Sequence, residues 1–224
     1  MIVNENITKY LHSLETDNEP FLEELRIYAK EHDVPIIRRE MESFLSVLLN
    51  LSKAEKVLEI GTGIAYSASF MARHSGFLKR IDTIENYPPR IEKAKETLQI
   101  YQDLSGESGA LIHLIEGDAA KVLPELEGGY DLIFLDGPKA QYLTMLPDLL
   151  RLLKEGGILL PDNVLQEGEL VRSRYVTQRR DRTIHERMRD FVWEVKHHPQ
   201  LLTSVLTIGD GVTLSYKKTE GEKN

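Results

Sequence analysis

The stretch KVLEIGTGIAYS, residues 56 to 67, joins a short apolar run to a glycine turn and then to a helical pattern. A short, mostly apolar run is typical of a strand that is covered on both faces of a parallel sheet. Gly61 and Gly63 allow the backbone of the turn to approach a nucleotide. A dinucleotide fingerprint needs a third small residue where this chain has Tyr66. The turn therefore indicates a nucleotide-like ligand without a diphosphate.

The same strand pattern repeats along the chain. Four further runs of this kind are RIDTIE (80 to 85), LIHLIE (111 to 116), DLIFLD (131 to 136) and GILLPD (157 to 162). A Gly-Asp-Gly turn at 209 to 211 joins two alternating runs, which predicts an antiparallel hairpin. With the run at 56 to 60, these segments predict seven strands.

Helical patterns separate the strands. We expect helices at about 19 to 31, 38 to 50, 67 to 77, 88 to 104, 140 to 154 and 182 to 197. We expect Gly156 and Gly157 to close the helix at 140 to 154. Strand and helix in alternation predict an α/β fold with a doubly wound, mostly parallel sheet, preceded by two helices.

Composition favours a single domain over residues 1–224, with N-terminal helices in 1–52, a core in 53–218 and a polar tail at 219–224. The absence of cysteine excludes disulfides, thiolate metal sites and cysteine nucleophiles. No window approaches the roughly 20 apolar residues of a membrane span, and no signal-peptide core begins the chain. These features predict a soluble cytoplasmic protein that does not bind a membrane.

The net charge of −8 argues against broad binding to nucleic acid, but the charge reverses locally. The basic stretch, residues 172 to 189, contains Arg172, Arg174, Arg179, Arg180, Arg182, Arg187 and Arg189. Acidic residues are interleaved with these arginines, which suits a solvated loop and helix face. A surface that faces a polyanion is the equally weighted alternative.

Acidic residues mark the carboxyl ends of the predicted strands, where parallel sheets bind their ligands. Glu85 ends the second strand and suits a pair of ribose hydroxyls, or is only an exposed strand-end acid. Asp118 follows the third strand and suits a ligand or caps the next helix.

Three oxygen ligands follow the fourth and fifth strands. Asp136, Asp162 and Asn163 supply two carboxylates and an amide, the donors that Mg²⁺ prefers. Such a site would keep positions open for water and substrate oxygens. The alternative is that Asp162 and Asn163 only hydrogen-bond a turn.

The combination of EIGTGIAYS, TIE, EGDA, FLDGPK and LPDNVL resembles the class I S-adenosylmethionine-dependent methyltransferases. It is most similar to the metal-dependent O-methyltransferases related to catechol and caffeoyl-CoA O-methyltransferases, from about residue 34 to the final hairpin. The resemblance implies a Rossmann-like methyltransferase sheet, an S-adenosyl-L-methionine cofactor and Mg²⁺.

The resemblance also implies roles for individual residues. The residues implied at the cofactor are Met41, Gly61, Ser67, Glu85, Asp118, Ala119 and Asp136. Gly61 and Ser67 would lie along its methionine part, Glu85 would hold the ribose, and Met41 would reach over the cofactor near the methyl donor. Asp118 and Ala119 would face the adenine.

For the metal, the resemblance implies Asp136, Asp162 and Asn163 as ligands. Lys139 matches the general base of the catechol enzymes. Gly137 and Pro138 replace bulkier residues there, so the substrate wall differs.

Further features resemble the bacterial members that methylate 5-hydroxyuridine at the tRNA wobble position: EHDVPI, a short DGPKAQY loop, the basic stretch, and HHP followed by GDG. This narrower resemblance implies a tRNA anticodon loop as partner, bound through Arg172–Arg189. The wider family suggests a homodimer.

Three alternatives remain open. A small diphenol is a substrate of the same chemistry. Tyr66 and the predicted metal ligands argue against a nicotinamide-dependent oxidoreductase. The intact set of Asp136, Lys139, Asp162 and Asn163 argues against a non-catalytic binding module.

Overall fold

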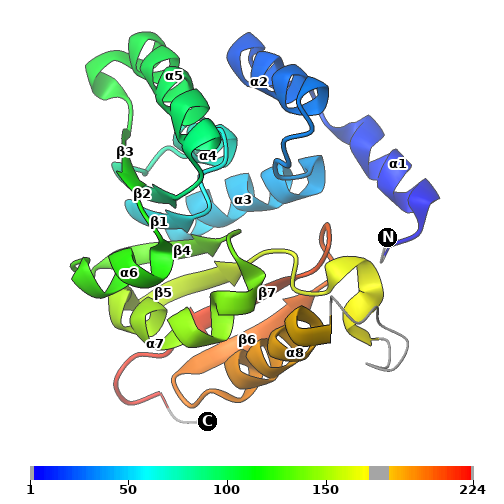
Figure 1. The fold of residues 1–224 in the computed structure, drawn as a ribbon, viewed down its shortest axis with the longest axis vertical. Coiled ribbons are helices and arrows are strands. Elements are labelled where there is room, and N and C mark those ends of the chain that lie inside the picture. The colour runs from blue at the N-terminus through cyan, green and yellow to red at the C-terminus, as the bar shows by residue number, and fades with distance from the viewer. Residues whose placement is uncertain (1–2, 172–181, 223–224) are drawn as a thin grey trace. The chain divides into compact units, whose positions relative to one another are not determined.

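The computed structural model describes residues 3–171 and 182–222. Its seven strands have the order β3-β2-β1-β4-β5-β7-β6 (Figure 1). The sheet is mostly parallel and ends in an antiparallel hairpin, which confirms the predicted fold class. The chain divides into two compact units, Asn6–Ala119 and Met1–Glu5 with Ala120–Asn224. We call them the N-terminal unit and the C-terminal unit.

The N-terminal unit begins with helices and continues as alternating strands and helices. Its elements are α1 (Glu5–Leu14), α2 (Pro20–Glu31), α3 (Arg39–Ser52), β1 (Lys56–Ile60), α4 (Tyr66–His74), β2 (Arg80–Glu85), α5 (Pro88–Ser105), η1 (Gly106–Ser108), β3 (Leu111–Glu116) and the start of α6 (Ala119–Val122). β2 pairs in parallel with both β1 and β3. Prolines in the first turns of α2 and α5 suit helix starts, where no backbone N–H is needed.

The C-terminal unit contains the remaining strands. Its elements are η2 (Leu123–Glu125), β4 (Tyr130–Leu135), η3 (Lys139–Gln141), α7 (Tyr142–Leu152), β5 (Leu153–Pro161), η4 (Gln166–Val171), α8 (Arg182–His197), β6 (Leu201–Leu206) and β7 (Val212–Lys217). β4 and β5 are parallel, and β7 is antiparallel to both β5 and β6. The predicted hairpin is therefore confirmed.

Burial explains why the apolar runs form strands. Leu132, Ile133, Phe134 and Leu135 of β4 are all fully buried, on both faces of the strand. In β1, Val57 and Leu58 are fully buried as well. A strand covered on both faces leaves only its ends for polar side chains. The acidic candidate site residues accordingly lie at or just after strand ends, whereas Met41 and Ser67 lie in helices.

One helix differs from the prediction. The chain has α1 before α2 and α3, where the sequence analysis expected two helices. The apolar residues of α1 have a helical spacing but none is buried: Ile7, Tyr10, Leu11 and Leu14 are all exposed. The helical spacing of these residues was visible in the sequence and was not used, so the missing helix is an error of the prediction.

The glycines at 156 and 157 correct a second expectation. They do not close a helix, since α7 ends at Leu152 and both glycines lie inside β5. Gly156 has a φ of +76°, and a Cβ on Gly157 would lie 2.8 Å from Leu153 Cδ1. The β4–β5 register also shifts beside this point. The glycines therefore permit an irregular start of the strand.

No helix within residues 3–171 and 182–222 combines the length and the apolar content that crossing a bilayer requires.

Candidate active site

The glycine turn after β1 is tied to the neighbouring strand. The backbone N–H groups of Gly61 and Thr62 donate to the Ile84 carbonyl at 3.0 and 3.2 Å. The N–H of Gly63 donates to Glu85 Oε2 at 2.9 Å. A Cβ on Gly63 would meet open space, so its φ of +56°, rather than crowding, favours glycine. The turn predicted to hold the cofactor thus has a defined conformation.

Glu85 has its carboxylate held by backbone amides. Oε1 accepts hydrogen bonds from the N–H groups of Asn86 and Tyr87, each at 3.0 Å, and Oε2 accepts from Gly63. The residue is buried, with 7% of its surface exposed. Each carboxylate oxygen has lone pairs beyond these bonds, so the fixed group suits a pair of hydroxyl donors. This geometry fits the predicted ribose contact.

A second acid, Glu59, lies in β1 just before the turn and is fully buried. It accepts hydrogen bonds from the Ser67 hydroxyl and, at 2.5 Å, from the Thr83 hydroxyl. The Thr62 and Thr83 hydroxyls are 2.6 Å apart. Ser67, predicted to lie along the methionine part of the cofactor, is therefore oriented by Glu59. Glu59 was not predicted to have a role, although an acid inside an apolar strand is visible in the sequence.

Three more of the predicted cofactor residues lie in the N-terminal unit, whereas Asp136 lies in the C-terminal unit. Met41 is buried in α3, Asp118 is half-buried just before α6, and Ala119 is the buried first residue of α6. Their contacts with a cofactor remain predictions.

The three predicted metal ligands come together in the C-terminal unit. The Asp162 N–H donates to the Leu135 carbonyl at 2.9 Å, which places the ends of β4 and β5 side by side. The Asn163 side-chain amide donates to Asp136 Oδ1 at 3.1 Å. The Asn163 backbone N–H donates to Asp162 Oδ1 at 2.6 Å. With its φ of +57°, Asn163 turns the chain sharply after the strand.

Negative charge accumulates at this position. Burial, followed by repulsion from Asp136, raises the pKa of Asp162 to about 7, although the positive charge of Lys139 lowers it. Burial and the same two carboxylates raise the pKa of Tyr142 well above its ordinary value. The Tyr142 hydroxyl donates to the Leu135 carbonyl at 3.0 Å. At Asp162, burial and like charge therefore outweigh the positive charge of Lys139.

These residues fit a divalent cation. A bound cation would offset the repulsion between Asp136 and Asp162, and the amide oxygen of Asn163 would add a neutral ligand. Within the described ranges, no group of three or more His, Cys, Asp or Glu side chains is placed to hold a metal ion. The candidate site therefore depends on two carboxylates and one amide.

Lys139 lies on the loop that follows Asp136, at the start of η3, and is half-buried. The guanidinium of Arg187, on α8, donates to the carbonyl of the next residue, Ala140, at 3.2 Å. Arg187 and Arg189 are exposed. The arginines at 172, 174, 179 and 180 lie outside the described residues. One described arginine of the basic stretch thus contacts the loop that carries Lys139.

Comparison with known proteins matches the chain to a methyltransferase family. A family model described as O-methyltransferase matches residues 12–218. Catechol O-methyltransferase of Mycobacterium tuberculosis is 28% identical over 169 residues, covering 74% of each chain. Caffeoyl-CoA O-methyltransferase 1 of Eucalyptus globulus is 31% identical over 228 residues, covering 92% of this chain and 86% of its own.

Solved structures share the fold. The SAH-bound methyltransferase PaMTH1 of Podospora anserina superposes with a TM-score of 0.83 at 25% identity, covering 98% of both chains. A protein from Staphylococcus aureus gives 0.82 at 30% identity, covering 95% of this chain and 98% of its own. Fold and site thus define a class I methyltransferase. The chain belongs to the O-methyltransferase family, as an S-adenosylmethionine-dependent enzyme of the group that includes catechol and caffeoyl-CoA O-methyltransferases.

Proposed function

We propose that this O-methyltransferase methylates 5-hydroxyuridine at the wobble position of tRNA to 5-methoxyuridine, with magnesium as its metal. Asp136, Asp162 and Asn163 would hold the metal, and Lys139 would act as the general base. The basic stretch would bind the phosphates of the anticodon loop.

The contact between Arg187 and Ala140 carries the RNA part of the proposal. It joins the described end of the basic stretch to the loop of Lys139. A base that is methylated at its ring hydroxyl has to leave its stack, while the phosphates around it stay outside. Arginines beside the catalytic loop suit this division, because guanidinium groups bind phosphate well.

Methyl transfer requires a substrate oxygen that is aligned with the methyl donor and a group that accepts the hydroxyl proton. When bound, S-adenosylmethionine supplies a methyl group on a sulfonium sulfur, and magnesium lowers the pKa of a coordinated hydroxyl. The methyl group would pass from this sulfur to the substrate oxygen, with S-adenosylhomocysteine as the second product. The hydroxyl proton passes to Nζ of Lys139, which must be neutral to accept it.

Two adjacent oxygens are what this set of ligands would recognise. In 5-hydroxyuridine the hydroxyl lies beside a ring carbonyl, and a catechol offers two neighbouring hydroxyls. Two relatives of the chain are catechol O-methyltransferases, which favours a second candidate, a small diphenol substrate.

One assay separates the two candidates. Labelled S-adenosylmethionine is offered with tRNA that carries unmethylated 5-hydroxyuridine, or with a simple catechol, each with magnesium and with a chelator. We expect magnesium-dependent labelling of the tRNA. Labelling of the catechol alone would retain the metal chemistry and refute the RNA substrate.

The homodimer stays a prediction. Sedimentation at several concentrations tests it, and a monomer at the highest concentration would contradict it.

A further inference from the structure

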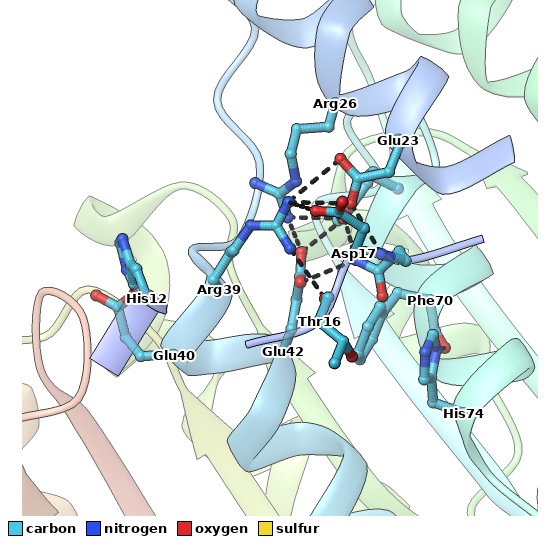
Figure 2. Close-up of polar contacts among 12 residues, drawn as sticks. His12, Thr16, Asp17, Glu23, Arg26, Arg39, Glu40, Glu42, Phe70 and His74 are labelled. Carbon is cyan, nitrogen blue, oxygen red and sulfur yellow. Dashed lines mark hydrogen bonds and ion pairs between the residues drawn. The ribbon is translucent and has the colours of Figure 1, made fainter. Parts of the chain in front are cut away.

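Four polar side chains form a cluster around Tyr66, the first residue of α4. We call it the Tyr66 cluster and define it by Asn18, Arg26, Glu42 and Tyr66. The Tyr66 hydroxyl donates to Glu42 Oε1 at 2.6 Å and accepts from Arg26 at 2.7 Å. Arg26 forms an ion pair with the same carboxylate. The Asn18 side chain donates to the other Glu42 oxygen at 3.2 Å. Figure 2 shows Arg26 and Glu42 facing each other from α2 and α3.

The cluster is closed to solvent at its centre. Tyr66 is 1% exposed and Glu42 is 5% exposed. Burial, partly opposed by the charge of Arg26, raises the pKa of Tyr66 to about 12. The phenol therefore keeps its proton and donates it to the carboxylate, so each partner has a fixed orientation.

The surrounding contacts attach the segment before α2 to the same helices. Arg39 donates to the Glu23 carboxylate at 3.0 and 3.2 Å and to the Thr16 carbonyl at 3.3 Å (Figure 2). Glu19 accepts two hydrogen bonds, each at 2.6 Å, from Arg73 of α4. The segment before α2 is thus attached to α3 through Arg39 and to the last turn of α4 through Arg73.

Tyr66 directly follows the turn of residues 61–65, which is the turn predicted to hold the cofactor. The turn is held elsewhere by the bonds from Gly63 to Glu85 and from Ser67 to Glu59. Both of these anchors come from strands. The Tyr66 hydroxyl adds an anchor from the helical layer, so the turn is fixed between strands and helices.

Stability alone explains the cluster poorly. Glu42 is buried and the Arg26 side chain is 23% exposed, so the ion pair is largely removed from water, and an apolar replacement of such a pair is often as stable. Among the described residues, no acceptor meets the buried Nε of Arg26, which adds a cost. Such an arrangement lowers the stability of the fold but fixes the side chains, which suits a site that has to be held in one conformation.

We propose that the Tyr66 cluster positions the turn of residues 61–65 for S-adenosylmethionine, with Tyr66 as a positioning residue that does not itself touch the reacting atoms. The proposal rests on the binding of the cofactor at this turn. It is independent of the acceptor substrate and of the metal.

The test compares two tyrosine replacements in the full-length protein. Tyr66→Phe removes the hydroxyl of the cluster. Tyr101→Phe is the matched control, because Tyr101 is also buried, 4% exposed, and donates its hydroxyl to the Ala110 carbonyl at 3.0 Å. Affinity for S-adenosylhomocysteine is measured by calorimetry without magnesium or acceptor, beside the unfolding temperature.

We expect Tyr66→Phe to raise the Kd for S-adenosylhomocysteine about fivefold to tenfold, and Tyr101→Phe to change it less than about twofold. The KM for S-adenosylmethionine should rise with it while kcat is largely kept. An unchanged Kd in Tyr66→Phe, or an equal rise in both variants, would overturn the proposal.

A second variant covers the case in which Tyr66→Phe does not fold. Glu42→Gln keeps an acceptor oxygen for the phenol but removes the charge that orients Arg26. We expect its Kd to rise about threefold, and an unchanged value refutes the positioning role. If the wild-type protein itself does not bind S-adenosylhomocysteine, the cofactor assignment fails instead.

Discussion

The acids of the two units differ in what already compensates them. In the N-terminal unit, Glu85 accepts three backbone N–H groups, and Glu59 accepts two hydroxyls. In the C-terminal unit, Asp162 is buried beside Asp136, and its pKa is raised to about 7. The first pair of acids is satisfied and suits neutral hydroxyl donors. The second pair is strained by like charge and suits a cation.

The largest expected effect tests the C-terminal acids. Asp162→Ala should lower methyl transfer at saturating magnesium by at least about a hundredfold, because one of two charged metal ligands is lost. Labelled S-adenosylmethionine measures the rate. Asp131→Ala is the control, since Asp131 lies in β4 and pairs with Lys154 at 2.7 Å, away from the strand end. Near-normal activity of Asp162→Ala would show that Asp162 does not hold a metal that the reaction needs.

The reciprocal change tests the N-terminal acids. Glu85→Ala should raise the Kd for S-adenosylhomocysteine about thirtyfold, because it removes an acceptor and leaves backbone N–H groups unpaired. Magnesium affinity, followed by calorimetry, should not change. The control is Glu116→Ala: Glu116 pairs in register with Glu85 at the end of the adjacent strand but is exposed. Equal losses in both variants would mean that any strand-end acid serves.

A third prediction uses the pH dependence of stability without metal. The raised pKa of Asp162 means that the folded protein binds its proton more tightly than the unfolded chain does. Stability from this group is therefore present at pH 4 and is lost as the pH rises to about 7. Asp162→Asn should exceed the wild type in free energy of unfolding by about 1.5 kcal/mol at pH 8.

Urea unfolding at pH 4 and pH 8, in the presence of a chelator, measures this difference. Addition of magnesium should stabilise the wild type and not the variant. A difference that is the same at both pH values would show that Asp162 is not repelled by its surroundings.

The smallest expected effect concerns the basic stretch. Arg187→Ala should raise the KM for tRNA about threefold and reduce the salt dependence of binding, because one phosphate contact is lost. Lys121→Ala is the control, because Lys121 is an exposed cation of the C-terminal unit outside the basic stretch. Similar effects in both variants would indicate that only total charge matters and not the contact with Ala140.

Much of the fold was predictable because its signals are local. The strands of 56 to 60 and 111 to 116 have the predicted bounds, and α8 begins and ends as expected. The acids that follow strand ends were predictable as candidates because the carboxyl ends of parallel strands meet at one edge of a sheet. Boundaries failed where the chain changes from α7 to β5 without a loop, because the glycines there belong to the strand.

The roles of Tyr66 and Glu59 were not predictable in this way. In the sequence, Tyr66 counts only as a bulky residue where a dinucleotide site needs a small one. In the structure its hydroxyl meets Arg26 and Glu42, which are 40 and 24 residues away along the chain. Glu59 likewise needs Thr83 from the adjacent strand.

By itself the sequence determined the alternation of strands and helices, the glycine turn, and the acids at the strand ends, because apolar periodicity and turn residues act over a few neighbours. Only the tertiary structure decided which of those acids are satisfied and which repel one another. Burial and charge proximity set these properties, and both arise from residues that are distant in the chain. The pKa of Asp162 and the orientation of Tyr66 therefore belong to the folded protein alone.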